Sequence, residues 1–229
     1  DIGPEASKPV MEGKGLLFKI FADIDVFDIE VGTKDIEEFI ATVKNISPTF
    51  GGINLEDIKA PESFEIERRL VEELNIPVMH DDQHGTAIIS SAALLNAVEL
   101  AGKKMEEVKM VISGAGSAAI ACANLYVSFG VKPENVVMFN SKGALRKDDP
   151  RVSDMQRIYA TDKHYDDLAH AMKGADVFIG LSSGDIVTPE MLLGMADNPI
   201  VFAMANPTPE INYNLAIDTR KDIIMATGR

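Results

Sequence analysis

The feature that most constrains the fold is the stretch KMVISGAGSAAIACANLYV, at residues 109–127. An apolar run of strand length leads into a glycine-bearing turn, and an apolar run of helix length follows. Glycines in such a turn allow a tight bend and let a pyrophosphate approach the amino end of the helix. The order of strand, glycine turn and helix is typical of dinucleotide-binding folds, whereas a plain strand-to-helix turn is the alternative.

The turn departs from the usual glycine fingerprint at its third position, where Ala119 stands. A small residue is allowed there because its role is close packing of the helix on the strand. Further apolar runs that lead into turns with Gly or Asn lie at 134–143, 165–185, 199–210 and 222–228. This repetition predicts a doubly wound parallel sheet of the Rossmann type.

The part before this domain also alternates between strand-length and helix-length runs. We interpret GLLFKIF as an apolar patch, DVFDIEV, GGINLEDI and IPVMH as strands, and TKDIEEFIATVKNI and PESFEIERRLVEEL as helices. A long apolar helix is expected from about Gly85 to a stop at Gly102. The fold class is therefore α/β, with a smaller α/β domain over residues 1–85 and a Rossmann-type, doubly wound dinucleotide-binding domain over residues 86–229.

Charge and cysteine content limit the possible partners. The formal net charge is −14, and the lysines and arginines are scattered, so a nucleic-acid backbone would be repelled. The single cysteine, Cys122, lies in a run that reads as a buried helix face, which fits a reducing cytoplasm. No segment has the uninterrupted apolar length that crossing a bilayer requires, so no membrane association is expected.

Two pairs of carboxylates follow predicted strands. Glu56 and Asp57 end one apolar run, and Asp81 and Asp82 end another. In open α/β folds ligands bind at the carboxyl ends of the strands, and oxygen-only ligands suit Mg²⁺ or Mn²⁺. Surface charge or helix capping is the alternative explanation for these acids.

The same stretch, PVMHDDQHGTA, spaces His80 and His84 four residues apart, as in some zinc sites. That pattern requires both histidines on one face of a helix. Here His80 is expected to end a strand and His84 to precede a helix that opens at Gly85, and no third ligand is evident. The sequence therefore favours Mg²⁺ or Mn²⁺ over zinc.

Lys14 lies between two glycines beside an apolar run, and Lys8 and Lys19 are rivals for the same role. A solvated loop lysine is the simpler interpretation. A lysine that is partly desolvated near a divalent cation would have a depressed pKa, which is what a general base near neutral pH requires.

Two asparagines end predicted strands of the second domain. Asn140 stands near the position where an acid would bind the ribose 2′-hydroxyl, and Lys142 nearby could pair with a 2′-phosphate. The choice between NAD and NADP therefore stays open. Asn206 precedes Pro207, and a residue before proline is disfavoured in a helix. The preference of Asn and Pro for turns also explains the pair without any function.

These residues and motifs together carry a resemblance to a known family. The blocks DIGP, KPVMEGKGLLFK, DVFDIEV, PTFGGINLEDIKAPE, IPVMHDDQHGTAII, SGAGSAAIA and ANPTPE run in order through the whole chain. On these blocks the chain closely resembles the bacterial malic enzymes, which are oxaloacetate-decarboxylating malate dehydrogenases.

The resemblance implies that residues 1–85 are part of a substrate- and metal-binding domain and that residues 86–229 are an NAD(P)-binding domain. It also implies roles for individual residues. The family's lysine base falls on Lys14, its metal ligands fall on Glu56, Asp57 and Asp82, and Asp81 lies beside the metal, so Lys14 and Asp81 are the expected catalytic residues. The expected dinucleotide-binding residues are Ser113, Gly114, Ala115, Gly116, Ser117, Ala118, Ala119, Asn140 and Asn206.

The reaction implied by the resemblance is the oxidative decarboxylation of malate to pyruvate and CO₂ with reduction of NAD(P). Lys14 would take the proton of the 2-hydroxyl as hydride leaves for the nicotinamide, and Mg²⁺ or Mn²⁺ would stabilise the enolate as CO₂ departs. Members of the family are usually homo-oligomers.

The resemblance also predicts a chain cut at both ends. The family's proton-donating tyrosine lies upstream of a segment that matches Asp1 onward, and a further asparagine for the nicotinamide follows the segment that matches ATGR. Two alternatives therefore stay open. One is a catalytically silent fragment that binds metal and dinucleotide, and the other is a 2-hydroxy acid dehydrogenase that does not decarboxylate.

Overall fold

The computed structural model describes residues 3–59 and 61–228. The first two residues of the DIGP block lie outside this part. The chain divides into two compact units, Asp1–Asp82 and Gln83–Arg229.

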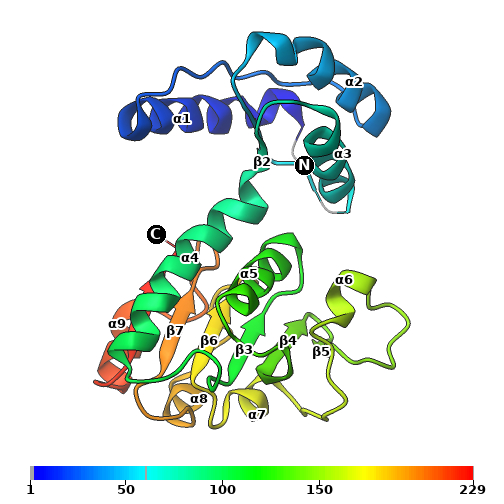
Figure 1. The fold of residues 1–229 in the computed structure, drawn as a ribbon. Helices are drawn as coiled ribbons and strands as arrows, with labels where there is room; N and C mark the ends of the chain where they lie inside the picture. Colours follow the sequence, from blue (N-terminus) through cyan, green and yellow to red (C-terminus); the bar gives the residue numbers. More distant parts are fainter. Residues whose placement is uncertain (1–2, 60, 229) are drawn as a thin grey trace. The chain divides into compact units, whose positions relative to one another are not determined.

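The first unit is built around a short parallel pair of strands with helices packed beside it (Figure 1). Its core joins Ile40 and Val43, Leu55, and Ile66 and Leu70 into one apolar cluster. The described elements are α1 (Pro4–Ala22), α2 (Ile36–Ile46), the 3-10 turn η1 (Ser47–Thr49), β1 (Ile53–Leu55), α3 (Glu62–Glu73) and β2 (Val78–His80). The two predicted helices, α2 and α3, and the strands at β1 and β2 are therefore confirmed.

The start of this unit differs from the prediction. The apolar patch GLLFKIF is the end of a helix, α1, and the segment DVFDIEV forms no strand. Pro4 in the first turn and Asp23 in a left-handed C-cap bound the helix. Pro9 lies inside it, and such residues weaken the helical pattern in the sequence. In the described residues no strand pairs with DVFDIEV, so its alternating pattern builds no sheet.

The second unit contains a six-stranded sheet in the order β5-β4-β3-β6-β7-β8 within the described residues. All neighbouring pairs are parallel except the edge pair β4–β5. The strands are β3 (Met110–Ser113), β4 (Val136–Asn140), β5 (Gly143–Ala144), β6 (Val177–Gly180), β7 (Ile200–Ala203) and β8 (Ile224–Thr227). The helices and turns are α4 (Asp81–Leu100), α5 (Ser117–Ser128), η2 (Pro133–Asn135), α6 (Asp154–Arg157), α7 (Leu168–Met172), α8 (Pro189–Leu193) and α9 (Tyr213–Thr219).

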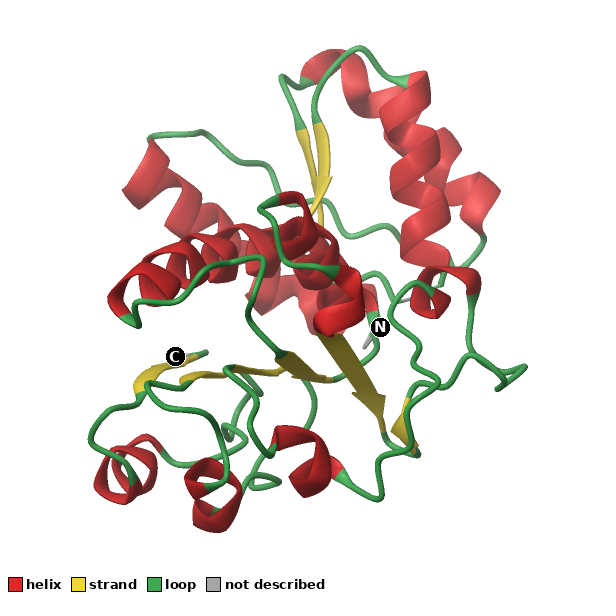
Figure 2. Cartoon of the chain, turned by 60° about the horizontal axis from the view of Figure 1, so that its bottom comes forward, coloured by secondary structure: helices red, strands yellow, loops and turns green. Residues whose placement is uncertain are grey.

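Helices cover both faces of this sheet (Figure 2). On one face, side chains of α4 and α5 such as Leu94 and Tyr126 pack against alternate strand residues such as Ile112 and Ile179. On the other face, side chains of α7, α8 and α9 meet the intervening strand residues, including Phe178 and Val201. Because both faces are covered, the strands are apolar throughout rather than alternating. The predicted doubly wound parallel sheet is confirmed.

The long helix α4 begins at Asp81, four residues before the predicted start at Gly85. Asp81 and Asp82 lie in its first turn, where negative charge is favoured by the partial positive charge of the helix terminus. Its end agrees with the prediction, since Gly102 follows it with a φ of 67°. None of the helices within residues 3–59 and 61–228 combines the length and the apolar character needed to cross a bilayer.

Cys122 is buried on the inner face of α5, as its sequence surroundings predict. Its Sγ lies 3.6 Å from Ser90 Oγ, which also accepts a hydrogen bond of 2.7 Å from the hydroxyl of the buried Tyr126. Burial raises the pKa of the Cys122 thiol. This small polar group is therefore part of the core between α4 and α5.

Candidate active site

Lys14 lies between two acids of the first unit. Its ammonium donates a hydrogen bond to the carboxylate of Asp81, and its Nζ is 3.3 Å from Oε2 of Glu56. The Glu56 side chain is only 7% exposed, whereas that of Lys14 is 30% exposed. Lys14 belongs to α1, Glu56 follows β1, and Asp81 follows β2, so three separate elements bring these charges together. Lys8 and Lys19 pair with other acids, among them Asp28 and Asp25.

The acids around Lys14 decide the direction in which its pKa shifts. Burial opposes the charged form of Lys14, but the hydrogen bond to Asp81 and the charges of Glu56 and Asp81 outweigh it, so the pKa of Lys14 is raised. The depression expected from the sequence concerns a lysine beside a divalent cation, so it stays a prediction for the metal-bound site, whereas the two carboxylates by themselves raise the pKa. Burial, reinforced by the charges of Asp82 and Asp81, raises the pKa of Glu56.

The pairing of β1 with β2 explains why the acids lie near one another. Leu55 and His80 are register partners in this parallel pair, so the residues that follow them leave the sheet at the same edge. Asp57 has a φ of 55°, a left-handed conformation that Asp tolerates better than most residues. Its backbone N–H donates a hydrogen bond of 3.1 Å to Oδ2 of Asp82.

The four acids have the chemistry of a divalent-cation site. Among residues 3–59 and 61–228, no three His, Cys, Asp or Glu side chains gather around one point, so the ligand set Glu56, Asp57 and Asp82 stays a prediction. The donors nevertheless fit Mg²⁺ or Mn²⁺, because carboxylate oxygens from two adjacent strand ends are hard ligands. Burial is the main cause of the raised pKa of Glu56, and the charge of Lys14 opposes it.

The two histidines of the PVMHDDQHGTA stretch lie in different elements and differ in exposure. His80 is fully buried at the end of β2, with its Nε2 3.9 Å from Oδ2 of Asp82. His84 lies inside α4 and is exposed, so the expectation that it precedes the helix is wrong. His80 is nevertheless outside the helix, and the two side chains do not form the helical pair of the zinc motif.

A hollow of about 760 Å³ adjoins Lys14 within the first unit. Its apolar lining includes Phe18 and Phe39. Its charged lining includes Lys14, Glu56 and Asp57 and, farther along, Asp25, Asp28, Glu30, Lys34, Asp35, Lys59 and Glu62. A small organic acid would therefore meet positive charge, metal-type ligands and an apolar wall in one place.

The glycine turn of the second unit lies where the strand order of the sheet changes direction. β4 and β6 flank β3 on its two sides, so the carboxyl end of β3 is the switch point at which doubly wound sheets bind ligands. Gly114 has a φ of 127°, and a Cβ there would lie 2.6 Å from the carbonyl oxygen of Leu181. Gly116 is the N-cap of α5 and makes no side-chain cap, which leaves the first N–H groups of the helix for an anion.

The remaining residues of the predicted dinucleotide set lie around this turn or at the same edge of the sheet. Ser113 ends β3 and is buried, and residues 117–119 form the first turn of α5. Asn140 ends β4 and is exposed, with its Oδ1 accepting a hydrogen bond of 2.8 Å from the backbone N–H of Lys142. Asn206 is exposed in the loop after β7.

Two residues at this edge were not identified from the sequence. Gln156, in α6, donates a hydrogen bond of 2.8 Å from its Nε2 to the carbonyl oxygen of Ala115 in the glycine turn. Its only sequence signal is the capping box with Ser153, which marks a helix start and not a site. Glu210 is fully buried and closes the ANPTPE block, and nothing in the spacing of the residues marked it as buried.

The surroundings of Gly114 and Gly116 differ, so substitution by alanine should have different effects at the two positions. We expect Gly114→Ala to weaken both folding and dinucleotide binding, because its Cβ would clash with backbone. Gly116→Ala has open space around its Cβ and should leave the melting temperature nearly unchanged while weakening dinucleotide binding about tenfold or more, since the phosphate must approach that position. Thermal melts and NADH titrations of both variants would check this, and tight binding by Gly116→Ala would contradict it.

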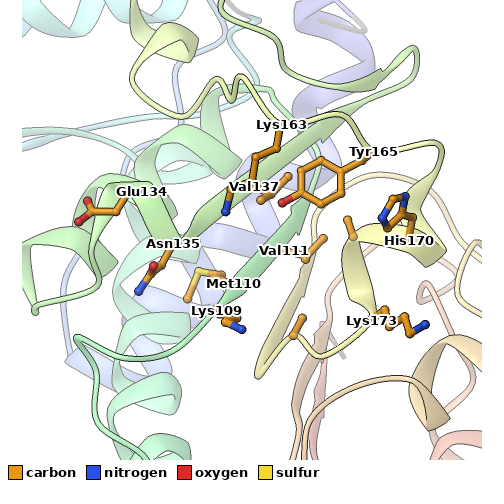
Figure 3. A pocket seen from close by; sticks show the side chains of 12 residues that line it. Lys109, Met110, Val111, Glu134, Asn135, Val137, Lys163, Tyr165, His170 and Lys173 are labelled. Atoms are coloured by element: carbon orange, nitrogen blue, oxygen red, sulfur yellow. The ribbon is translucent and has the colours of Figure 1, made fainter.

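A second hollow, of about 320 Å³, lies at the opposite edge of the sheet, beside the amino ends of β3, β4 and β6 (Figure 3). Its lining includes Lys109, Lys163, Lys173, Tyr165 and His170. The residues of the predicted dinucleotide site lie at the other edge, so the carboxyl edge of the sheet remains the candidate dinucleotide site.

Comparison with known proteins agrees with this reading of the residues. Residues 1–71 match the malic enzyme N-terminal domain, and residues 83–229 match the malic enzyme NAD binding domain. The chain belongs to the malic enzyme family. The resemblance found in its sequence blocks is thereby confirmed.

Individual relatives are similar over the whole of this chain. An NADP-dependent malic enzyme of Halomonas elongata is 54% identical over 229 residues, which are 54% of that protein. An NAD-dependent malic enzyme of Rhizobium meliloti is 52% identical, and the match covers 30% of it. The crystal structure of an NAD-dependent malic enzyme from Thermotoga maritima superposes with a TM-score of 0.93 at 48% identity, covering all of this chain and 61% of that one. The chain thus spans between 30% and 61% of the length of these relatives.

Proposed function

We propose that the protein catalyses the oxidative decarboxylation of malate to pyruvate and CO₂ with reduction of NAD or NADP, using Mg²⁺ or Mn²⁺. The observation that carries the proposal is the placement of Lys14 between Asp81 and Glu56 at the paired ends of β1 and β2. A proton-transferring amine beside a set of hard oxygen ligands is what the removal of a hydroxyl proton from a metal-chelating hydroxy acid requires.

In this proposal the side chains of the first unit hold malate and move its proton. Lys14 Nζ takes the proton of the 2-hydroxyl, and Asp81, which accepts a hydrogen bond from the same nitrogen, orients the lysine and can receive a proton from it. Glu56, Asp57 and Asp82 would hold the cation. When bound, the cation supplies a Lewis acid for the oxygen atoms of malate, and NAD(P) supplies the hydride acceptor.

The second unit would hold the dinucleotide. We assign the pyrophosphate to the glycine turn at residues 113–119, the adenosine ribose to the region of Asn140, and the nicotinamide end to the region of Asn206. The position of the turn at the sheet's switch point supports this assignment. Relatives with NAD in their names and relatives with NADP in their names are about equally similar to this chain, so both cofactors remain in the proposal.

The proposal includes the domain organisation and the setting of the protein. A substrate- and metal-binding domain over residues 1–85 and an NAD(P)-binding domain over residues 86–229 are supported by the two compact units. A homo-oligomer is supported by exposed apolar side chains of α1 such as Leu16, Ile20 and Phe21. The unpaired, buried Cys122 supports a location in the cytoplasm.

A silent fragment that binds metal and dinucleotide without turnover is the second candidate, because the proposed metal ligands and the proposed dinucleotide-binding turn lie in two separate compact units. Calorimetric titrations with Mn²⁺ and with NADH, followed by an assay of malate-dependent NAD(P) reduction, separate the two candidates. Binding of both ligands without turnover would favour the silent fragment. Failure to bind either ligand would contradict both.

A further inference from the structure

Glu210 is a buried carboxylate without a positively charged partner in the described part of the chain. It is 0% exposed, and its two oxygens accept hydrogen bonds from backbone N–H groups, Oε1 from Ser182 at 3.1 Å and Oε2 from Ala205 at 3.0 Å. Burial raises the pKa of Glu210 even though these N–H groups favour its charged form. Burying such a group opposes folding, so its placement calls for a role other than core packing.

The two N–H groups belong to loops that leave adjacent strands. Ser182 follows β6 and Ala205 follows β7, and these strands are parallel neighbours, so both loops lie at the carboxyl edge of the sheet. Backbone hydrogen bonds join the same loops, since Val187 N–H donates to the carbonyl of Glu210 at 2.9 Å and Asp185 N–H donates to that of Pro209 at 3.0 Å. Glu210 therefore ties the loop that carries Asn206 to the loop after β6.

Contacts continue from the loop after β6 to the glycine turn. The hydroxyls of Ser182 and Ser113 are 2.8 Å apart, and Leu181 N–H donates to the carbonyl of Ser113 at 2.7 Å. The fit around the carboxylate is close, because a Cβ on Gly180 would lie 2.2 Å from Cδ of Glu210. The carboxylate is thus joined through Ser182 to the residue that opens the turn.

We propose that Glu210 is a positioning residue for the dinucleotide. It holds the loops after β6 and β7 at a fixed spacing from the glycine turn, so that a cofactor seated on the turn meets Asn206 at its nicotinamide end. This inference rests on the proposed function. A carboxylate suits the task because it accepts from two N–H groups at once, whereas the glutamine of Glu210→Gln has one acceptor oxygen and would turn an NH₂ group toward the other N–H.

The test compares Glu210→Gln with Tyr126→Phe, a variant that removes a buried hydrogen bond far from the carboxyl edge, between α5 and α4. Amide hydrogen exchange at Ser182 and Ala205, the affinity for NADH and NADPH, and the melting temperature are measured for both. We expect Glu210→Gln to speed exchange at these two amides and to weaken dinucleotide binding about tenfold, the scale of one charge-assisted hydrogen bond. Tyr126→Phe should lower the melting temperature without either effect.

Equal dinucleotide affinity in Glu210→Gln and the wild-type chain would overturn the inference and leave the proposed function in place. Dinucleotide binding that falls equally in Glu210→Gln and Tyr126→Phe would also overturn it, since the loss would then follow stability alone. Absence of binding by the wild-type chain would instead contradict the proposed function itself. If Glu210→Gln does not fold, exchange in the wild-type chain decides, because rapid exchange at both Ser182 and Ala205 would show that the carboxylate does not hold them.

Discussion

Lys14→Ala is expected to lower kcat for malate-dependent NAD(P) reduction by about 10²–10⁴-fold, the usual contribution of a positioned general acid–base group. Lys14 pairs with both Asp81 and Glu56, and within residues 3–59 and 61–228 no other lysine pairs with either acid. Steady-state rates with saturating malate, dinucleotide and Mn²⁺ measure the effect. Binding of the dinucleotide, which is assigned to the other unit, should be unchanged.

Lys19→Ala is the matched control for this prediction. Lys19 lies on the same helix, but its side chain is 53% exposed and pairs with Asp23 and Asp25. Its loss should leave kcat within about twofold of the wild-type value, because exposed ion pairs contribute little. If Lys14→Ala and Lys19→Ala had the same rate as the wild-type chain, Lys14 would not be the base.

Asp82→Asn is expected to weaken Mn²⁺ binding by roughly a hundredfold or more, because substitutions of residues that only support metal ligands already cost about 10–100-fold. The amide removes a negative charge and an anionic donor from the predicted ligand set. Calorimetry or the electron paramagnetic resonance signal of free Mn²⁺ measures the affinity. Chelation of the metal should abolish turnover in the wild-type chain, and added Mn²⁺ should restore it.

Glu65→Gln provides the control for charge alone. The Glu65 side chain is 44% exposed and that of Asp82 is 45% exposed, but Glu65 pairs with Arg68 on α3. Both substitutions remove one negative charge at similar exposure, and only the change at Asp82 should affect Mn²⁺ binding. An equal, small change in both variants would mean that Asp82 is not a ligand.

Local signals in the sequence explain which parts of the fold were predictable. Burial on both faces requires apolar and β-branched residues in β3, β6 and β7, and these runs are visible in the sequence. The tight turn after β3 requires glycine, which is visible in the same way. The placement of Glu56 and Asp57 at the same edge as Asp81 and Asp82 was also predictable in part, because both pairs follow strands of one parallel ladder.

Other features depend on contacts that the sequence does not display. The helix α1 contains Pro9 and two glycines, so its pattern is weak, and Lys14 meets Asp81 across 67 residues. The direction of the Lys14 pKa shift follows from those distant acids, which the sequence next to Lys14 does not indicate. Glu210 is buried only because two backbone N–H groups from separate loops converge on it.

The most direct test of the proposed function is the parallel measurement of NAD(P)H formed and CO₂ released from malate by the wild-type chain with Mn²⁺. Oxidative decarboxylation predicts equal amounts of the two products, and both should disappear in Lys14→Ala. NAD(P)H formed without CO₂ would contradict the proposal in favour of a 2-hydroxy acid dehydrogenase, and neither product from a chain that binds Mn²⁺ and dinucleotide would contradict it in favour of a silent fragment.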